Sequence, residues 1–232
     1  MNPITPLMPH SRWLAAALSL WCAGAFAEAP MVTDDAGTLG KGGYKVEFEW
    51  AREGSVRGPA LGFGFAPVEH LEIGLVVARA SDHATVPSTA ERTTGLSFKW
   101  VPLTWGETTA GLKLELANAR PDGAPRVRDT ALTLLLTHRY DGGHAVHLNL
   151  GHAVARPQGG PSQSVNTWSI GGEWALSPTV SLTGDLFGDS GPGDTGRQLG
   201  LRWRVQEGVA LSIGLGRQNG QNLGRAVAAW EF

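Results

Sequence analysis

Apolar and polar side chains alternate along most of the chain from residue 44 to its end. In the first run, residues 44–50, the even positions are aromatic or aliphatic, whereas Lys45, Glu47 and Glu49 occupy the odd positions. Such a period of two predicts an extended strand with one apolar and one polar face. Eleven further runs follow, and the last covers residues 224–232. The pattern predicts twelve strands, an even number as in bacterial single-chain barrels.

The connections between these runs alternate in length and composition. One set is short and rich in Pro, Gly and Asp: 66–69, 102–107, 141–143, 177–179 and 206–208. The other set is mostly longer and more polar: 80–93, 120–129, 154–166 and 188–196, with shorter members at 53–58 and 218–222. Short turns at one end and longer loops at the other are typical of transmembrane barrels and not of a soluble β-sandwich, the alternative fold. Residues 44–232 are therefore predicted to form an all-β, 12-stranded antiparallel transmembrane up-and-down β-barrel, with its short turns in the periplasm.

Aromatic residues sort by strand end. The short-turn ends of the apolar rows carry Tyr44, Phe65, Trp100, Tyr140, Trp174, Trp203, Trp230 and Phe232. Trp50 and Trp168 fall at the opposite ends. Aromatic girdles at both interfaces are a feature of barrels that face outer-membrane lipid.

The last run ends the chain on Phe232, with Trp230 two positions earlier on the same face. This segment resembles the C-terminal strand of bacterial outer-membrane β-barrels. The resemblance implies that the barrel-insertion machinery binds this strand and that the strand closes the barrel against the first one.

Composition alone would also suit a soluble protein, since 17% of residues are charged and the mean hydropathy is −0.10. Averages over the whole chain do not reveal a transmembrane barrel, because only every second strand residue faces lipid. The formal net charge of −2 gives no basic footprint, which argues against nucleic acid as a partner. Cys22 is the only cysteine, and it lies in the leader described next. Disulfides, cysteine zinc sites and thiol catalysis are therefore not expected in the mature chain.

Residues 1–27 have the pattern of a cleaved secretory signal. Arg12 supplies the positive charge, residues 13–26 form an apolar core, and Ala25-Phe26-Ala27 fits the cleavage rule. Outside this leader no stretch of about 18 apolar residues exists, so no helical membrane span is predicted. Residues 28–43 are polar and glycine-rich, and they are predicted to be an irregular periplasmic lead-in to the barrel.

The inward-facing rows carry seven positive and seven negative charges when Glu231 of the last run is included. The predicted pore-lining residues are Lys45, Glu47, Glu49, Glu72, Lys99, Lys113, Glu115, Arg139, His147, Asn149, Glu173, Asp185, Arg202, Arg204 and Arg225. Two interpretations stay open. These charges pair across a narrow barrel and fill it, or they line a small polar channel with little ion selectivity. Inward glycines, among them Gly171, Gly200 and Gly214, leave space and favour a passage.

Signals for catalysis are weak, so no enzyme activity is predicted. Outer-membrane lipases and deacylases use a Ser and a His on the lipid-facing surface, but none of the histidines around residues 138–152 has a serine two positions on. His138 shares the outward register and His147 points inward beside Asn149. Asp34 and Asp35 suggest either a calcium-ligand pair or, more commonly, a turn or cap. No metal and no cofactor is predicted.

Residues 30–43 are similar to the start of the outer-membrane transporter family linked to the meta-pathway of phenol degradation. The matching positions are Thr33, Asp34, Asp35, Gly37, Gly40, Lys41 and Gly43. The resemblance implies a transporter-like barrel, associated in some members with uptake of aromatic compounds. From the sequence we expect a passive channel for small solutes, with the lead-in as a constriction at the periplasmic mouth. The alternative is a closed barrel that works through its extracellular loops, and a membrane-embedded hydrolase ranks third.

Overall fold

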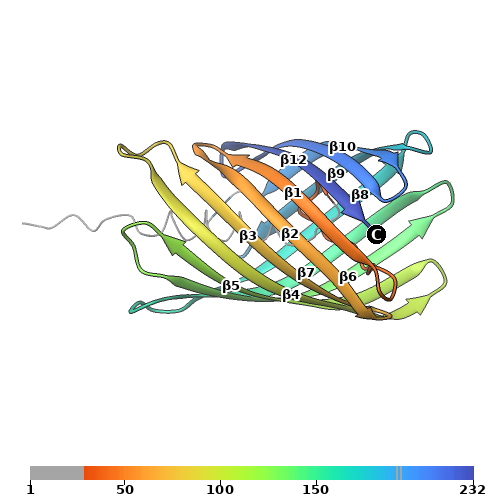
Figure 1. Ribbon diagram of the computed structural model, residues 1–232, viewed down its shortest axis with the longest axis horizontal. Helices are drawn as coiled ribbons and strands as arrows, with labels where there is room; N and C mark the ends of the chain where they lie inside the picture. Colours follow the sequence, from red (N-terminus) through yellow and green to blue (C-terminus); the bar gives the residue numbers. More distant parts are fainter. Residues whose placement is uncertain (1–28, 192, 194) are drawn as a thin grey trace, which may run out of the picture.

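Twelve β-strands close into one antiparallel barrel in the computed structural model, which describes residues 29–191, 193 and 195–232 (Figure 1). The strands are β1 (Tyr44–Glu53), β2 (Val56–Val68), β3 (Leu71–Asp82), β4 (Thr89–Trp105), β5 (Thr108–Pro121), β6 (Val127–Tyr140), β7 (His144–Pro157), β8 (Gln163–Ala175), β9 (Val180–Asp189), β10 (Gly196–Gln206), β11 (Val209–Gln218) and β12 (Gln221–Glu231). Each strand pairs with its neighbours in sequence, and β1 pairs with β12. The predicted up-and-down barrel is therefore confirmed.

The seam between β1 and β12 is fully paired. Its register runs from Lys45 opposite Glu231 to Glu53 opposite Leu223. At the rim, the Phe232 amide donates to the Tyr44 carbonyl at 2.9 Å and the Tyr44 amide donates to the Phe232 carbonyl at 3.0 Å. Closure leaves no sheet edge with unpaired backbone groups, as a sheet surrounded by lipid requires.

The polarity of the barrel is inverted relative to a soluble protein. Outward-facing apolar side chains are exposed, as for Leu215 at 68%. Inward-facing charged side chains are buried, as for Lys99 at 4% and Asp185 at 5% exposure. Burying charge while exposing large apolar side chains is stable only if the outer surface meets an apolar solvent.

The two ends of the barrel differ in their connections, and we call them the short-turn end and the long-loop end. The short-turn end carries the turns β2–β3, β4–β5, β6–β7, β8–β9 and β10–β11 with the C-terminus, on the right in Figure 1. Gly106 and Gly208 adopt positive φ there, 56° and 70°, a region that favours glycine. The long-loop end carries the other connections.

Several connections are shorter than predicted because the strands extend further. The loops at 83–88, 122–126 and 158–162 replace the expected 80–93, 120–129 and 154–166. The polar strand ends still pair, as Arg79 does with Arg92. At the other end, β4 continues past Trp100 to Trp105 through a register shift, so the turn predicted at 102–107 is also tighter. Polar composition therefore marked where strands leave the apolar band and not where they end.

No helix in the described part of the chain is long and apolar enough to cross a membrane. The predicted signal peptide and Cys22 lie outside the described residues, so both stay predictions.

Candidate functional site

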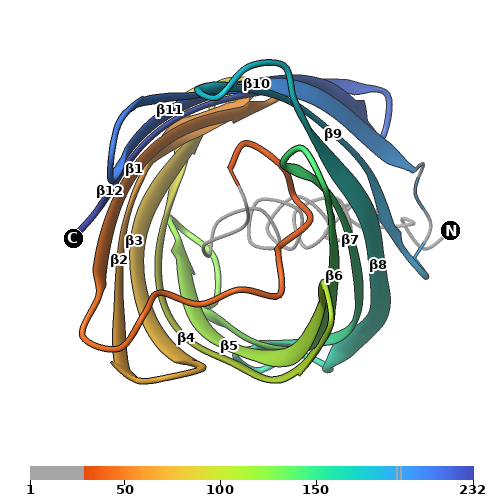
Figure 2. The ribbon, with the colours of Figure 1, turned by 90° about the vertical axis from the view of Figure 1, so that its right-hand side faces the viewer.

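Residues 29–43 are called the lead-in segment from here on; residues 29–39 lie inside the barrel, and residues 40–42, next to β1, are exposed. Figure 2 looks into the short-turn end, and this segment crosses the interior within the ring of strands before it joins β1. Met31 and Thr33 are completely buried, and Asp34 is 5% exposed. The segment therefore occupies the lumen, whereas the sequence predicted a constriction at the periplasmic mouth.

Side chains from β6, β7 and β9 bind the backbone amides of the segment. Asp185 accepts from the amides of residues 32 and 33 through one carboxylate oxygen, at 2.6 and 3.0 Å. Asn149 accepts from the Asp34 amide at 2.8 Å and donates to the Asp34 carbonyl at 3.1 Å. Thr137 accepts from the Ala36 amide at 2.7 Å. These side chains supply the partners that an irregular buried backbone needs.

The adjoining strands β10 to β12 bind the carbonyls at the start of the segment. Arg225 on β12 donates to the carbonyls of Pro30 and Met31, at 3.3 and 3.1 Å. Gln198 on β10 also donates to the Pro30 carbonyl, and Ser212 on β11 donates to the carbonyl of residue 29 at 3.3 Å. The segment is thus held from strands on both sides of the lumen.

Two adjacent carboxylates anchor the middle of the segment among three cations, of which Lys99 and Lys113 are buried and Arg139 is exposed. Lys99 Nζ lies 2.9 Å from Asp34 Oδ1 and 2.8 Å from Asp35 Oδ1. Lys113 Nζ lies 2.9 Å from Asp34 Oδ2, and an Arg139 nitrogen lies 3.1 Å from Asp35 Oδ2. The two aspartates are therefore neither a calcium site nor a turn cap. Their partners are the lumen lysines and arginine that the sequence assigned to the pore.

Burial alone would raise the pKa of Asp35, but the paired Lys99 and nearby Arg139 hold the pKa of this carboxyl well below its usual value. The carboxylate is therefore ionised across the neutral range, and its charge holds the segment in place.

Inward glycines provide the room in which the segment packs. A side chain on Gly171 of β8 would lie 2.9 Å from Thr33 and 3.1 Å from the Met31 sulfur. Gly200 and Gly214 face Pro30 in the same way. The interpretation that these three glycines mark an open passage is wrong, because the lead-in segment fills the space that they leave.

The remaining predicted lumen charges mostly pair along the wall. The pairs are Lys45–Glu47 at 3.7 Å, Lys113–Glu115 at 3.3 Å, Arg202–Glu173 at 3.4 Å and Arg225–Glu49 at 3.2 Å. Glu72 accepts from the Leu39 amide at 3.2 Å, and His147 Nδ1 lies 2.9 Å from the Thr137 hydroxyl. Arg204 is exposed near the end of β10, beside a register shift. Some lumen residues therefore pair with one another and others contact the lead-in segment. The strand periodicity does not show which residues belong to which group.

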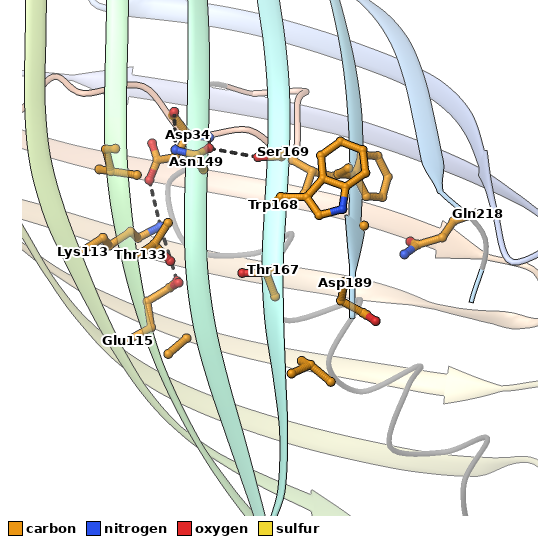
Figure 3. Close-up of a pocket in the computed structure, with 16 residues that line it drawn as sticks. Asp34, Lys113, Glu115, Thr133, Asn149, Thr167, Trp168, Ser169, Asp189 and Gln218 are labelled. Carbon is orange, nitrogen blue, oxygen red and sulfur yellow. Dashed lines mark hydrogen bonds and ion pairs between the residues drawn. The ribbon is translucent and has the colours of Figure 1, made fainter. Parts of the chain in front are cut away.

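A pocket lies between the lead-in segment and the long-loop end (Figure 3). One side is polar, with Asp34, Lys113, Glu115 and Asn149. Leu135, Val165 and Phe187 add apolar surface. Asp189 and Gln218 extend the lining toward the long-loop end, where their strands terminate. The pocket is therefore an amphipathic space bounded below by the segment.

Four uncharged residues that contact the segment were not predicted as site residues: Thr109, Thr137, Gln198 and Ser212. Their inward position follows from the strand alternation, which was the available signal.

The histidines considered for catalysis make ordinary contacts. His138 Nδ1 lies 2.8 Å from the Thr108 hydroxyl, and its ring meets Tyr140 edge-on at 4.5 Å. Within the described residues, no group of three or more His, Cys, Asp or Glu side chains is placed to hold a metal ion.

Comparisons with known proteins agree on the class of fold. The family model described as "Uncharacterised conserved protein UCP029691" matches residues 16–229. No curated protein matches the chain significantly. These matches do not confirm the resemblance to the phenol-pathway family, which stays a prediction.

Solved outer-membrane channels share the architecture. The KdgM porin, solved also in complex with disordered oligogalacturonate, has a TM-score of 0.64 and 9% identity over 81% of this chain and 99% of that one. The COG4313 outer membrane channel from Pseudomonas putida F1 has a TM-score of 0.63 and 12% identity over 85% and 98%. The NanC porin has 0.58 and 7% over 81% and 98%. At such identities the likeness shows the fold, and these neighbours are channels and not enzymes.

Proposed function

This chain belongs to the family described as uncharacterised conserved protein UCP029691, and we propose that its barrel is a passive channel for small solutes in a bacterial outer membrane. The barrel faces lipid with apolar side chains and encloses a polar interior, which supports that location. The fold that it shares with outer-membrane channels supports passive conduction. An export signal at residues 1–27 and recognition of the strand ending at Phe232 by the insertion machinery belong to the same proposal.

The lead-in segment is the element that controls passage in this proposal. Solutes from the long-loop side enter the amphipathic pocket and meet the segment at Asp34, which lines the pocket floor. Mixed charge on one side and Leu135 and Phe187 on the other suit small organic solutes with both polar and apolar parts. Aromatic acids fit that description and agree with the family resemblance of residues 30–43.

The observation that carries the proposal is that the segment is held by side-chain contacts at its backbone and by ion pairs at two residues. Such contacts break and reform without unfolding the barrel, because the barrel strands pair independently of the segment. A filled lumen also favours the second candidate, a closed barrel that acts through its loops. Conductance decides between the two.

Deleting residues 29–40 is the direct test. We expect single-channel conductance in planar bilayers to rise severalfold and to shift toward anions, because Lys99, Lys113 and Arg139 lose the carboxylates of Asp34 and Asp35. The matched control replaces Glu107 and Asp141, exposed residues in two short turns, by Gln and Asn.

Liposome swelling with solutes of graded size, including benzoate and a neutral sugar, then ranks what passes through the wild-type barrel. Zero conductance for the wild type, with an open pore only after the deletion, would favour the closed barrel. Zero conductance for both would reject the channel.

A further inference from the structure

The outward-facing rows of nine strands carry an arginine near the long-loop end. These strands are β1 to β7, β10 and β11, and each contributes one exposed arginine. In β3, for example, Val77 faces lipid and Arg79 is the next outward residue. At the short-turn end the same kind of row ends in an aromatic residue, such as Tyr44 or Trp203. The two ends therefore present different chemistry to a membrane.

The arginines lie directly opposite one another across the strands. Arg92 is paired in register with Arg79 on one side and with Arg120 on the other. The remaining six form opposed pairs: Arg52 with Arg57, Arg128 with Arg156, and Arg197 with Arg217. These nine side chains are called the arginine ring from here on. Like charges directly opposite one another destabilise a sheet unless something neutralises them.

Among the residues that the structure describes, no carboxylate forms an ion pair with a ring arginine. By the strand alternation, the outward positions of the twelve strands hold no Asp or Glu within the described residues. Three ring arginines donate hydrogen bonds to neutral oxygens. Arg52 donates to the Gly54 carbonyl at 2.9 Å, Arg156 to the Thr130 hydroxyl at 3.4 Å and Arg217 to the Gly220 carbonyl at 3.3 Å. The charge therefore points outward without a carboxylate partner in that part of the chain.

The ring stands just above the apolar band. An outward residue lies about 7 Å along the strand from the previous one, since each residue rises about 3.3 Å. Arg52 follows Trp50, Arg197 precedes Leu199 and Arg217 follows Leu215 by that single step. This height is that of lipid headgroups, where long cationic side chains reach out of the hydrocarbon.

The choice of side chain also points to phosphate. Lysine is absent from the ring, and the chain places Lys45, Lys99 and Lys113 inside the barrel. The guanidinium group binds phosphate oxygens with two parallel hydrogen bonds, whereas an ammonium group acts as a point charge. One phosphate seated between two opposed arginines would satisfy both.

We propose that the arginine ring binds the phosphate groups of anionic lipid in the leaflet at the long-loop end. The inference rests on the membrane location in the proposed function and not on conduction. Phosphorylated glycolipid of the lipid A type fits best among such lipids, because its two separated phosphates can engage neighbouring arginine pairs at once. The lipid would thereby fix the depth of the barrel and relieve the repulsion within the ring.

Native mass spectrometry of the detergent-solubilised barrel, titrated with lipid A, tests the proposal. We expect Arg92→Gln with Arg120→Gln to weaken lipid A binding about tenfold, as the loss of two charge-assisted contacts implies. Arg92→Lys with Arg120→Lys should weaken it less. The charge-matched control is Lys41→Gln with Arg126→Gln, which removes two exposed cations outside the ring and should bind as the wild type does.

Three results would overturn the proposal. These are equal binding by the Gln pair and the wild type, equal binding of dephosphorylated lipid A, and displacement of lipid A by equimolar inorganic phosphate, which would indicate an ion site. If the first pair does not fold, Arg128→Gln with Arg156→Gln carries the same test. Lipid binding is read without conduction, so failure here and failure of the channel are separable.

Discussion

At the scale of single residues, one glycine decides how closely the lead-in segment approaches the wall. The atoms nearest to a side chain on Gly171 belong to Met31 and Thr33 of the segment. A larger residue there would therefore press on the segment before it disturbed β8.

We expect Gly171→Leu to displace the segment while the barrel stays folded. Overpacking of this kind costs about 1–3 kcal/mol. Here we expect this cost to weaken the binding of the lead-in segment to the barrel wall. Single-channel conductance should rise toward that of the 29–40 deletion. In the deletion background the same substitution should change nothing. A rise in conductance in that background would show that Gly171 acts through the wall instead.

At the scale of elements, the lead-in segment docks through charges that respond to pH. The pKa of Asp35 in the docked segment lies below its usual value of 3.8. Protonation therefore favours the undocked segment. Docking is fully supported above pH 4 and loses support as the pH falls below it.

We expect conductance to rise reversibly as the pH is lowered from 5 to 3. One carboxylate with a lowered pKa gives up at most about 1.4 kcal/mol of docking free energy per pH unit. The Asp35→Asn variant should have a flatter profile, whereas Asp141→Asn, in an exposed turn, should keep the wild-type profile. An identical pH response in the 29–40 deletion would assign the effect to the barrel wall.

The sequence predicted the barrel better than it predicted the site. Strand alternation is local, so the run from Tyr44 to Trp50 already shows which face meets lipid. The contacts of the lead-in segment are not local, since Asp34 and Asn149 lie 115 positions apart. No period links an irregular segment to the wall. Asp34 and Asp35 therefore looked like a possible calcium pair, and Gly171 looked like open space.

At the scale of the whole molecule, the inverted polarity sets how the protein behaves in solution. Exposed Leu and Trp side chains surround the barrel between its two ends, and buried charges such as Lys99 and Asp185 lie inside. The closed ladder has no weak edge from which unfolding can begin in detergent.

We expect the chain without residues 1–27 to need detergent for solubility and to migrate differently on gels before and after boiling. Unboiled barrel should run as a compact species because closure survives the detergent. Deleting Phe232 removes both backbone hydrogen bonds with Tyr44 and should lower the temperature of this conversion by a few degrees. A detergent-free, soluble monomer with one gel mobility would contradict the transmembrane barrel.

The seam holds a further consequence for biogenesis. Phe232 meets Tyr44 at the rim, and the segment that enters the lumen joins the barrel at that same point. The pairing of β12 with β1 therefore takes place beside the lead-in segment, which must already have entered the lumen. If β12 pairs with β1 before the lead-in segment has entered the lumen, the segment stays outside. Early and late closure would therefore yield two populations of the same protein, one with an open lumen and one with a filled lumen.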